Sequence, residues 1–301
     1  MAEPESAAAS IPTLFRAAVR RCPDAPAVVG SGRDLSFSAL DIASDGVADA
    51  LVKAGITRGE RIALYCPNGA AFVIAYLGIL KAGACVVPIN LLLNPLEIGF
   101  ILRDAGVRAF FYHRSLVEPA VRALDETPGV AFRVGIGAGS EAGGAELDLD
   151  DMAASGQSPT ARDGQVSADD LAAILYTSGT TGRPKGAMLS HGNLGANAAS
   201  VMQALALEPG RDRILVVLPM FHAFAATVGM LVPLLHGLSL VPMVRFDPRQ
   251  VSAAIAEHGA SVFLGVPSMY TLLLRLHAAA VAPRPRPPPT ARAAAPPPRP
   301  A

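Results

Sequence analysis

Short apolar runs alternate with helical patterns along most of the chain. Eight of these runs have the length and composition of buried strands: residues 27–29, 61–66, 84–90, 108–113, 171–177, 214–219, 238–243 and 261–266. Segments with a helical spacing of apolar residues lie between many of them. Because parallel strands are joined through helical crossovers, this alternation predicts an α/β fold with mostly parallel sheets flanked by helices.

Three segments carry the clearest helix signals. Residues 38–54 place apolar side chains on one stripe, and Gly55 follows as the expected C-terminal cap. Residues 70–80, AAFVIAYLGIL, are apolar on every face, which predicts a helix buried between two layers. Residues 94–106 open with Asn-Pro, a cap followed by proline in the first turn, and close on glycine.

Residues 136–170 interrupt the alternation with glycine, serine and acidic residues, including aspartates at 148, 150 and 151. Paired carboxylates could hold a metal or act as an acid–base pair. A solvated surface loop is the favoured interpretation, because nothing apolar encloses them. We take this loop as a seam, which gives subdomains at 1–165 and 166–279 and a tail at 280–301.

Residues 214–244 contain no Asp, Glu, Lys or Arg, and the segment is long enough to cross a bilayer. Three prolines divide it, however, and its apolar pattern changes from strand to helix and back to strand. A buried strand–helix–strand unit is therefore favoured over a transmembrane span.

The tail is built from Ala, Pro, Arg, Thr and Val, which cannot form a packed core, so it is expected to be disordered or polyproline-like. It could be a ligand for a proline-recognition domain, a spacer, or a wrong-frame reading of a GC-rich gene, and we favour the last. Residues 261–276 just before it read as ordinary core sequence that stops abruptly.

Composition narrows the function classes. The net charge is zero, and four arginines lie in the tail, so the remaining chain is mildly acidic and lacks the clustered basic face of a nucleic-acid-binding protein. The three cysteines form no CxxC pair, which fits reduced thiols. The acidic start MAEPESAAAS is unlike a secretory signal, and we expect a cytoplasmic protein without a transmembrane span.

The stretch YTSGTTGRPKG at 176–186 follows the apolar run 171–177. Its glycines let successive backbone N–H groups turn inward, its hydroxyls donate beside them, and Lys185 adds a positive charge, a combination that suits phosphate oxygens. Lys185 is followed by glycine, so this is not the Walker pattern. The residues alone leave two readings, a phosphate cradle and a polar turn between strands.

The same stretch resembles the signature of the adenylate-forming superfamily, which includes acyl-CoA synthetases, aryl-CoA ligases, luciferases and peptide-synthetase adenylation domains. The segments 63–106, LPMFHAFA at 218–225 and FLGVPSMYTLL at 263–273 resemble further parts of that superfamily, so the similarity covers roughly residues 10–278. FHAFA and GVPSMY look most like fatty-acyl or aryl-CoA ligases. The resemblance implies part of the large N-terminal domain of this fold.

The resemblance also implies a reaction and its site. A carboxylic acid, here a fatty acid, would react with ATP and Mg²⁺ to give an acyl-adenylate and pyrophosphate, and coenzyme A would then displace AMP. The implied phosphate-binding residues are Thr177, Ser178, Gly179, Thr180, Thr181, Gly182, Arg183, Pro184, Lys185 and Gly186. Thr177 or Thr181 would reach the magnesium ion. His222, Gly265 and Val266 would line the acyl pocket; the residues alone favour a core role for His222.

Three motifs of this family are missing from the 301 residues. No Tyr-Gly-x-Thr-Glu or Thr-Gly-Asp segment follows residue 191, and no lysine follows Lys185 to match the lysine of the mobile C-terminal domain. We therefore expect a truncated chain that is inactive alone. We also expect uncovered sheet edges and helix faces, with marginal stability or aggregation as the result. The alternative function is a non-catalytic remnant that binds only phosphate or acyl groups.

Overall fold

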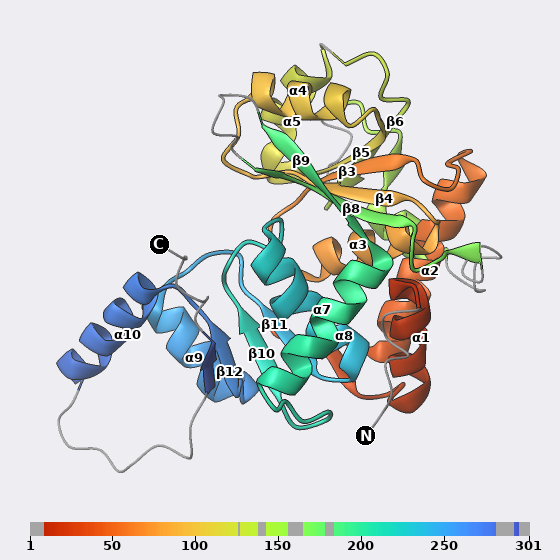
Figure 1. Cartoon of the computed structure of the whole chain (residues 1–301). Coiled ribbons are helices and arrows are strands. Elements are labelled where there is room, and N and C mark those ends of the chain that lie inside the picture. The colour runs from red at the N-terminus through yellow and green to blue at the C-terminus, as the bar shows by residue number, and fades with distance from the viewer. Residues whose placement is uncertain are drawn as a thin grey trace.

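Two sheets with helices around and between them form the fold (Figure 1). The computed structural model describes residues 9–125, 127–137, 143–155, 165–177, 184–280 and 292–294. One sheet has seven strands in the order β7-β6-β5-β3-β4-β8-β9, and the other has six in the order β13-β12-β10-β11-β1-β2. All strand pairs are parallel except β1–β2 and β8–β9, so the predicted α/β class with mostly parallel sheets is confirmed.

The strands lie close to the predicted apolar runs. Those of the seven-stranded sheet are β3 (Arg61–Tyr65), β4 (Cys85–Pro88), β5 (Val107–His113), β6 (Phe132–Ile136), β7 (Leu147–Asp148), β8 (Leu171–Thr177) and β9 (Lys185–Ser190). Those of the six-stranded sheet are β1 (Pro26–Val28), β2 (Leu35–Ser36), β10 (Arg213–Val216), β11 (Ser239–Pro242), β12 (Val262–Leu264) and β13 (Arg292–Ala294).

The helices connect these strands. They are α1 (Ile11–Arg21), α2 (Phe37–Lys53), α3 (Ala70–Lys81), α4 (Pro95–Asp104), the 3₁₀ turn η2 (Arg114–Leu116), α5 (Val117–Leu124), α6 (Leu149–Ala154), α7 (His191–Ala204), the π-helix η4 (Ala225–Leu231), α8 (Val232–His236), α9 (Pro248–His258) and α10 (Pro267–Ala280). Asn94 caps α4 in a reciprocal capping box with Glu97, as the Asn-Pro signal indicates.

Alternate residues of the strands face different layers of helices. Ala63 and Phe110 pack with α4 and α5, whereas Ile62 and Phe111 join the large central core with α2 and α3. On the six-stranded sheet, Ile214 belongs to the central core, and the residues that point the other way pack under α9 and α10. The central helices thus lie between the two sheets, and α3 is buried along nearly its whole length, as its sequence predicts.

The central layer contains a buried ion cluster. Lys81 is fully buried at the end of α3, and its Nζ lies 2.7 Å from Asp41 Oδ1 and 2.9 Å from Asp45 Oδ1 on α2. Arg16 of α1 pairs with the same two carboxylates at 2.7 and 2.6 Å. Three helices are therefore joined by charges that balance one another, which a buried charge requires.

His191 ties the first helix to the end of the β8–β9 hairpin. Its ring is 1% exposed, and Nδ1 accepts a hydrogen bond of 3.2 Å from the backbone N–H of Ile11. Burial lowers the pKa of His191 to about 4, and the charge of Asp170 opposes this shift only in part. The native protein therefore holds a neutral imidazole at this position.

The structure corrects one expectation and leaves two others open. Residues 147–154 are β7 and α6 rather than loop, because Leu149 and Met152 are buried and Asp148 caps the helix by accepting from Asp150 N–H. The division near residue 165 stays a prediction; β8 and β9 extend the sheet of the first half, and β1 and β2 extend that of the second. Of the tail, the structure describes only Ala280, the last residue of α10, and the three residues of β13.

Two observations bear on the surface. Within the described parts of the chain, no helix is both long and apolar enough to cross a membrane. Edge strand β9 is exposed over its first four residues, and Met188 on it is 71% exposed. Leu274 on α10 is exposed to the same extent.

Candidate functional site

The β8–β9 hairpin places the two ends of the glycine- and threonine-rich loop side by side. Thr177, the last residue of β8, is paired with Lys185, the first residue of β9. The residues between them that could line a phosphate cradle, Ser178, Gly179, Thr180, Thr181, Gly182 and Arg183, lie outside the described residues. Thr177 and Lys185 are exposed, and Lys185 forms no ion pair with any described residue. Within the described part of the chain, no carboxylate neutralises this ammonium group at the base of the loop.

Gly186 is required by packing within the hairpin. A Cβ at this position would lie 2.7 Å from Ile174 Cγ2 and 3.1 Å from the ring of Tyr176, its cross-strand partner. Such distances are shorter than a side chain tolerates, so only glycine lets β9 approach β8 this closely. Tyr176 in turn donates from its hydroxyl to Asp104 Oδ2 at 2.5 Å, which anchors the hairpin to the end of α4. Burial, followed by the neighbouring Asp104, raises the pKa of Tyr176.

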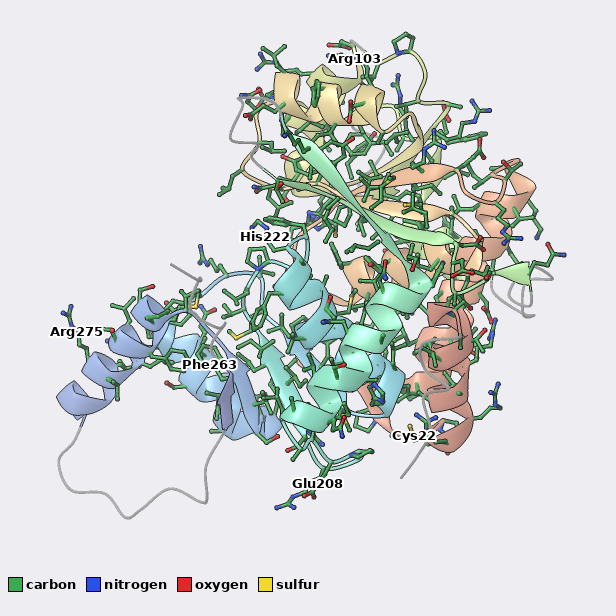
Figure 2. The ribbon with its side chains drawn as sticks, viewed as in Figure 1. Cys22, Arg103, Glu208, His222, Phe263 and Arg275 are labelled. Carbon is green, nitrogen blue, oxygen red and sulfur yellow. The ribbon has the colours of Figure 1, made fainter. Side chains whose placement is uncertain are left out.

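His222 lies beyond the carboxyl end of β10, in a turn closed by its backbone N–H bond to Pro219 O at 3.0 Å. Its ring contacts that of Phe221, with centroids 4.4 Å apart, and the residue is exposed. Partial desolvation lowers the pKa of His222, which favours the neutral imidazole. Figure 2 shows His222 at the boundary where the upper and lower sheets approach each other.

Gly265 and Val266 follow β12, the parallel neighbour of β10. Carboxyl ends of adjacent parallel strands meet at one edge, so these residues and the turn of His222 belong to the same edge of the six-stranded sheet. A Cβ on Gly265 would lie 2.7 Å from the ring of Phe263 and 3.3 Å from that of Tyr270. Tyr270 donates to Phe263 O at 3.1 Å, and this closes the turn from β12 into α10.

Asn68 joins the two sheets next to this turn, and the sequence reading missed it. Its Nδ2 donates to Leu218 O at 2.9 Å and to Met243 O at 3.0 Å, and its Oδ1 accepts from Met220 N–H at 2.8 Å. The side chain reaches from the β3–α3 turn to the segments after β10 and β11. Asn68 therefore positions the backbone that carries His222. The only available signal was an asparagine before glycine after a predicted strand.

The helix that follows His222 is a π-helix over Ala225–Leu231, where the sequence predicts an ordinary helix. All seven of its residues are buried. Gly229 allows close contact with β10, because a Cβ there would lie 2.8 Å from Val216 Cγ2. π-Helices occur often beside functional sites, and this one leads directly out of the His222 turn.

No three side chains of His, Cys, Asp or Glu within the described ranges gather as a metal-ligand set. The described residues instead place an exposed lysine and a hydroxyl at the base of a β-hairpin loop, and an imidazole in the turn after β10. These features define an α/β protein with mostly parallel sheets, whose candidate site residues follow the carboxyl ends of β8, β10 and β12.

Comparison with known proteins identifies the family of this α/β protein. Residues 15–295 match the family of AMP-binding enzymes, and the chain belongs to that family. It is 36% identical over 251 residues to a feruloyl-CoA synthase from an Amycolatopsis species, covering 83% of this chain and 47% of the relative. It is 32% identical to the long-chain-fatty-acid–CoA ligase FadD13 of Mycobacterium tuberculosis, covering 79% of this chain and 46% of the relative.

Solved structures agree with this assignment. The N-terminal domain of FACL13 from M. tuberculosis superposes with a TM-score of 0.78 at 30% identity, covering 88% of this chain and 65% of that domain. The anthranilate-CoA ligase AuaEII, solved with anthranoyl-AMP, gives 0.79 at 25% identity, covering 87% of this chain and 51% of the other. The chain spans about half the length of the curated relatives it matches.

Proposed function

We propose that this chain is part of an ATP-dependent carboxylate–CoA ligase, which forms an acyl-adenylate and then an acyl-CoA. The observation that carries the proposal is the β8–β9 hairpin, which sets the exposed Thr177 and Lys185 at the two ends of a glycine- and hydroxyl-rich loop. Adenylation turns a carboxylate oxygen into a good leaving group, and it needs fixed positive charge and donors for the departing pyrophosphate. The family and its CoA-ligase relatives support this reaction.

Each residue that the resemblance implies would have a role in this proposal. Lys185 would contact the β- and γ-phosphates of ATP, and Thr177 or Thr181 would contribute a hydroxyl to Mg²⁺, an ion that would neutralise phosphate charge when bound. Ser178, Gly179, Thr180, Gly182 and Arg183 would supply the rest of the cradle, with Pro184 and Gly186 shaping its base. His222, Gly265 and Val266 form the wall beside the carboxylate of a fatty acid. We place the protein in the cytoplasm.

A second candidate is a non-catalytic chain that binds phosphate or acyl groups only. The observation in its favour is that the Tyr-Gly-x-Thr-Glu, Thr-Gly-Asp and late-lysine motifs occur nowhere in the 301 residues. For the same reason we propose that these residues alone complete neither half-reaction. Aryl acids are the second substrate class, because one relative is named as a feruloyl-CoA synthase.

ATP–pyrophosphate exchange with a panel of fatty and aryl acids tests the proposal. We expect no exchange by the 301 residues alone. We expect acid-dependent exchange once residues 1–278 are fused to the remaining part of the Amycolatopsis relative, and the same fusion carrying Lys185→Ala serves as the control. A fusion that unfolds cooperatively yet exchanges with no acid would contradict the ligase proposal and favour the second candidate.

A further inference from the structure

At its loop end, the β8–β9 hairpin is a two-stranded ribbon. β8 pairs with β4 at Ala173, whereas Tyr176 and Thr177 have register partners only on β9 among the described strands. β9 is the last strand in the order of the seven-stranded sheet, and its first four residues are exposed. Because a two-stranded ribbon is marginally stable at best in water, this end of the hairpin needs a further contact to hold its position.

The side chain of Tyr176 connects this ribbon to α4. Its ring lies against Gly186 on the opposite strand, where an added Cβ would lie 3.1 Å from the ring carbon that carries the hydroxyl. The hydroxyl donates to Oδ2 of Asp104, the last residue of α4, at 2.5 Å. Figure 1 shows α4 beside the loop end of the hairpin. One side chain thus touches both strands of the ribbon and holds them to a helix.

Helix α4 itself does not explain the carboxylate of Asp104. The carbonyl end of a helix disfavours negative charge, and Asp104 stands in the last turn of α4. The residue is also exposed, so packing does not require it. Burial, followed by the hydrogen bond to Asp104, raises the pKa of Tyr176, so the hydroxyl keeps the proton that it donates. A charge-assisted hydrogen bond of this kind is about twice as strong as one between neutral groups.

The next pair of the ribbon, after Tyr176 and Gly186, is Thr177 and Lys185 at the base of the loop. We propose that Tyr176 is a positioning residue for the phosphate ligand, and that its hydrogen bond to Asp104 fixes this neighbouring pair. The inference rests on the proposed function of the hairpin. A ribbon that the protein already holds in place binds more tightly than one that the ligand must first order, because the cost of ordering then does not oppose binding.

Calorimetric titration of the 301-residue chain and its variants with Mg²⁺-pyrophosphate tests the proposal. Tyr176→Phe keeps the ring and removes the hydroxyl, and its Kd should rise about tenfold, as when the binding-competent fraction falls to about one tenth. Asp104→Ala should have the same effect. Asp104→Asn removes the same charge but keeps an acceptor oxygen, so it should bind at least as tightly as the parent chain. Combining Tyr176→Phe with Asp104→Ala should weaken binding no further, because both changes remove one hydrogen bond.

Tyr112→Phe is the matched control. Tyr112 lies on β5 of the same sheet, outside the hairpin, and its hydroxyl donates to Gly143 O at 3.1 Å. Its loss should lower the free energy of unfolding and leave the Kd for Mg²⁺-pyrophosphate unchanged. A purely structural role of Tyr176 would give the same result in Tyr176→Phe, and that outcome would overturn the proposal. So would binding by Asp104→Asn that is as weak as binding by Asp104→Ala.

A second measurement needs no ligand and separates this proposal from the proposed function. Hydrogen exchange of the β9 amides in the free chain reports how firmly the ribbon is held. We expect Tyr176→Phe and Asp104→Ala, but not Asp104→Asn, to speed this exchange by about tenfold. If the parent chain binds no pyrophosphate, the proposed phosphate site fails, and faster exchange in Tyr176→Phe would still support the hold on the ribbon. Unchanged exchange in Tyr176→Phe would overturn that hold.

Discussion

Replacing Asn68 by alanine should weaken the junction between the two sheets more than its small size suggests. The change removes three hydrogen bonds of 2.8 to 3.0 Å and leaves the N–H of fully buried Met220 without a partner. An unsatisfied buried donor costs about 1–3 kcal/mol, and each partly buried carbonyl loses a bond worth about 1 kcal/mol. We therefore expect the free energy of unfolding to fall by roughly 3–5 kcal/mol.

Urea unfolding followed by circular dichroism measures this loss. Asn94→Ala is the matched control, because it removes an asparagine whose side chain caps one helix locally and should cost about 1 kcal/mol. Asn68→Asp should be at least as destabilising as Asn68→Ala, since it turns a carboxylate toward two carbonyl oxygens. If Asn68→Ala costs no more than the Asn94 control, the side chain does not hold the sheets together as described.

Three further changes test other parts of the account. Gly186→Ala places a Cβ against β8, so the free energy of unfolding should fall by about 1–3 kcal/mol and MgATP binding should weaken. An unchanged free energy of unfolding would refute the packing argument. Between pH 6.5 and 4, His191 binds a proton in the unfolded chain but not in the native protein. The free energy of unfolding should therefore fall by about 3 kcal/mol as the pH drops through this range. His191→Gln should reduce this pH dependence, as measured by urea titrations at several pH values. Lys81→Met removes a cation from the buried Asp45 and the partly buried Asp41, and it should cost about 3–5 kcal/mol of stability. The exposed Lys53→Met is the control, and an equal cost of the two changes would count against the ion cluster.

Most strands were predictable because their signal is local. The run RIALYC becomes β3 and LAAILYT becomes β8, since a continuous apolar run between polar turns has few other stable arrangements. The same reasoning failed at residues 147–154, where the aspartates favoured a loop prediction. The structure has a short helix there, and Leu149 and Met152 lie on its buried side. There the carboxylate of Asp148 caps the start of the helix.

The site was predictable only in part, because its geometry depends on contacts between distant residues. The motif at 176–186 marks the hairpin, and its chemistry indicates phosphate. Nothing local indicates that Asn68 reaches the backbone of Met220, 152 residues later. That contact depends on how the two sheets are placed, which apolar spacing does not reveal.

The most direct test of the central claim is calorimetric titration of the 301-residue chain with Mg²⁺-pyrophosphate, alongside Lys185→Ala and the exposed-lysine control Lys53→Ala. We predict saturable binding that Lys185→Ala weakens by roughly 10- to 100-fold, the value of one charge-assisted phosphate contact, and that Lys53→Ala leaves unchanged. Binding that is absent in the parent chain, or that is equally strong in Lys185→Ala, would contradict the assignment of the β8–β9 loop as a phosphate cradle.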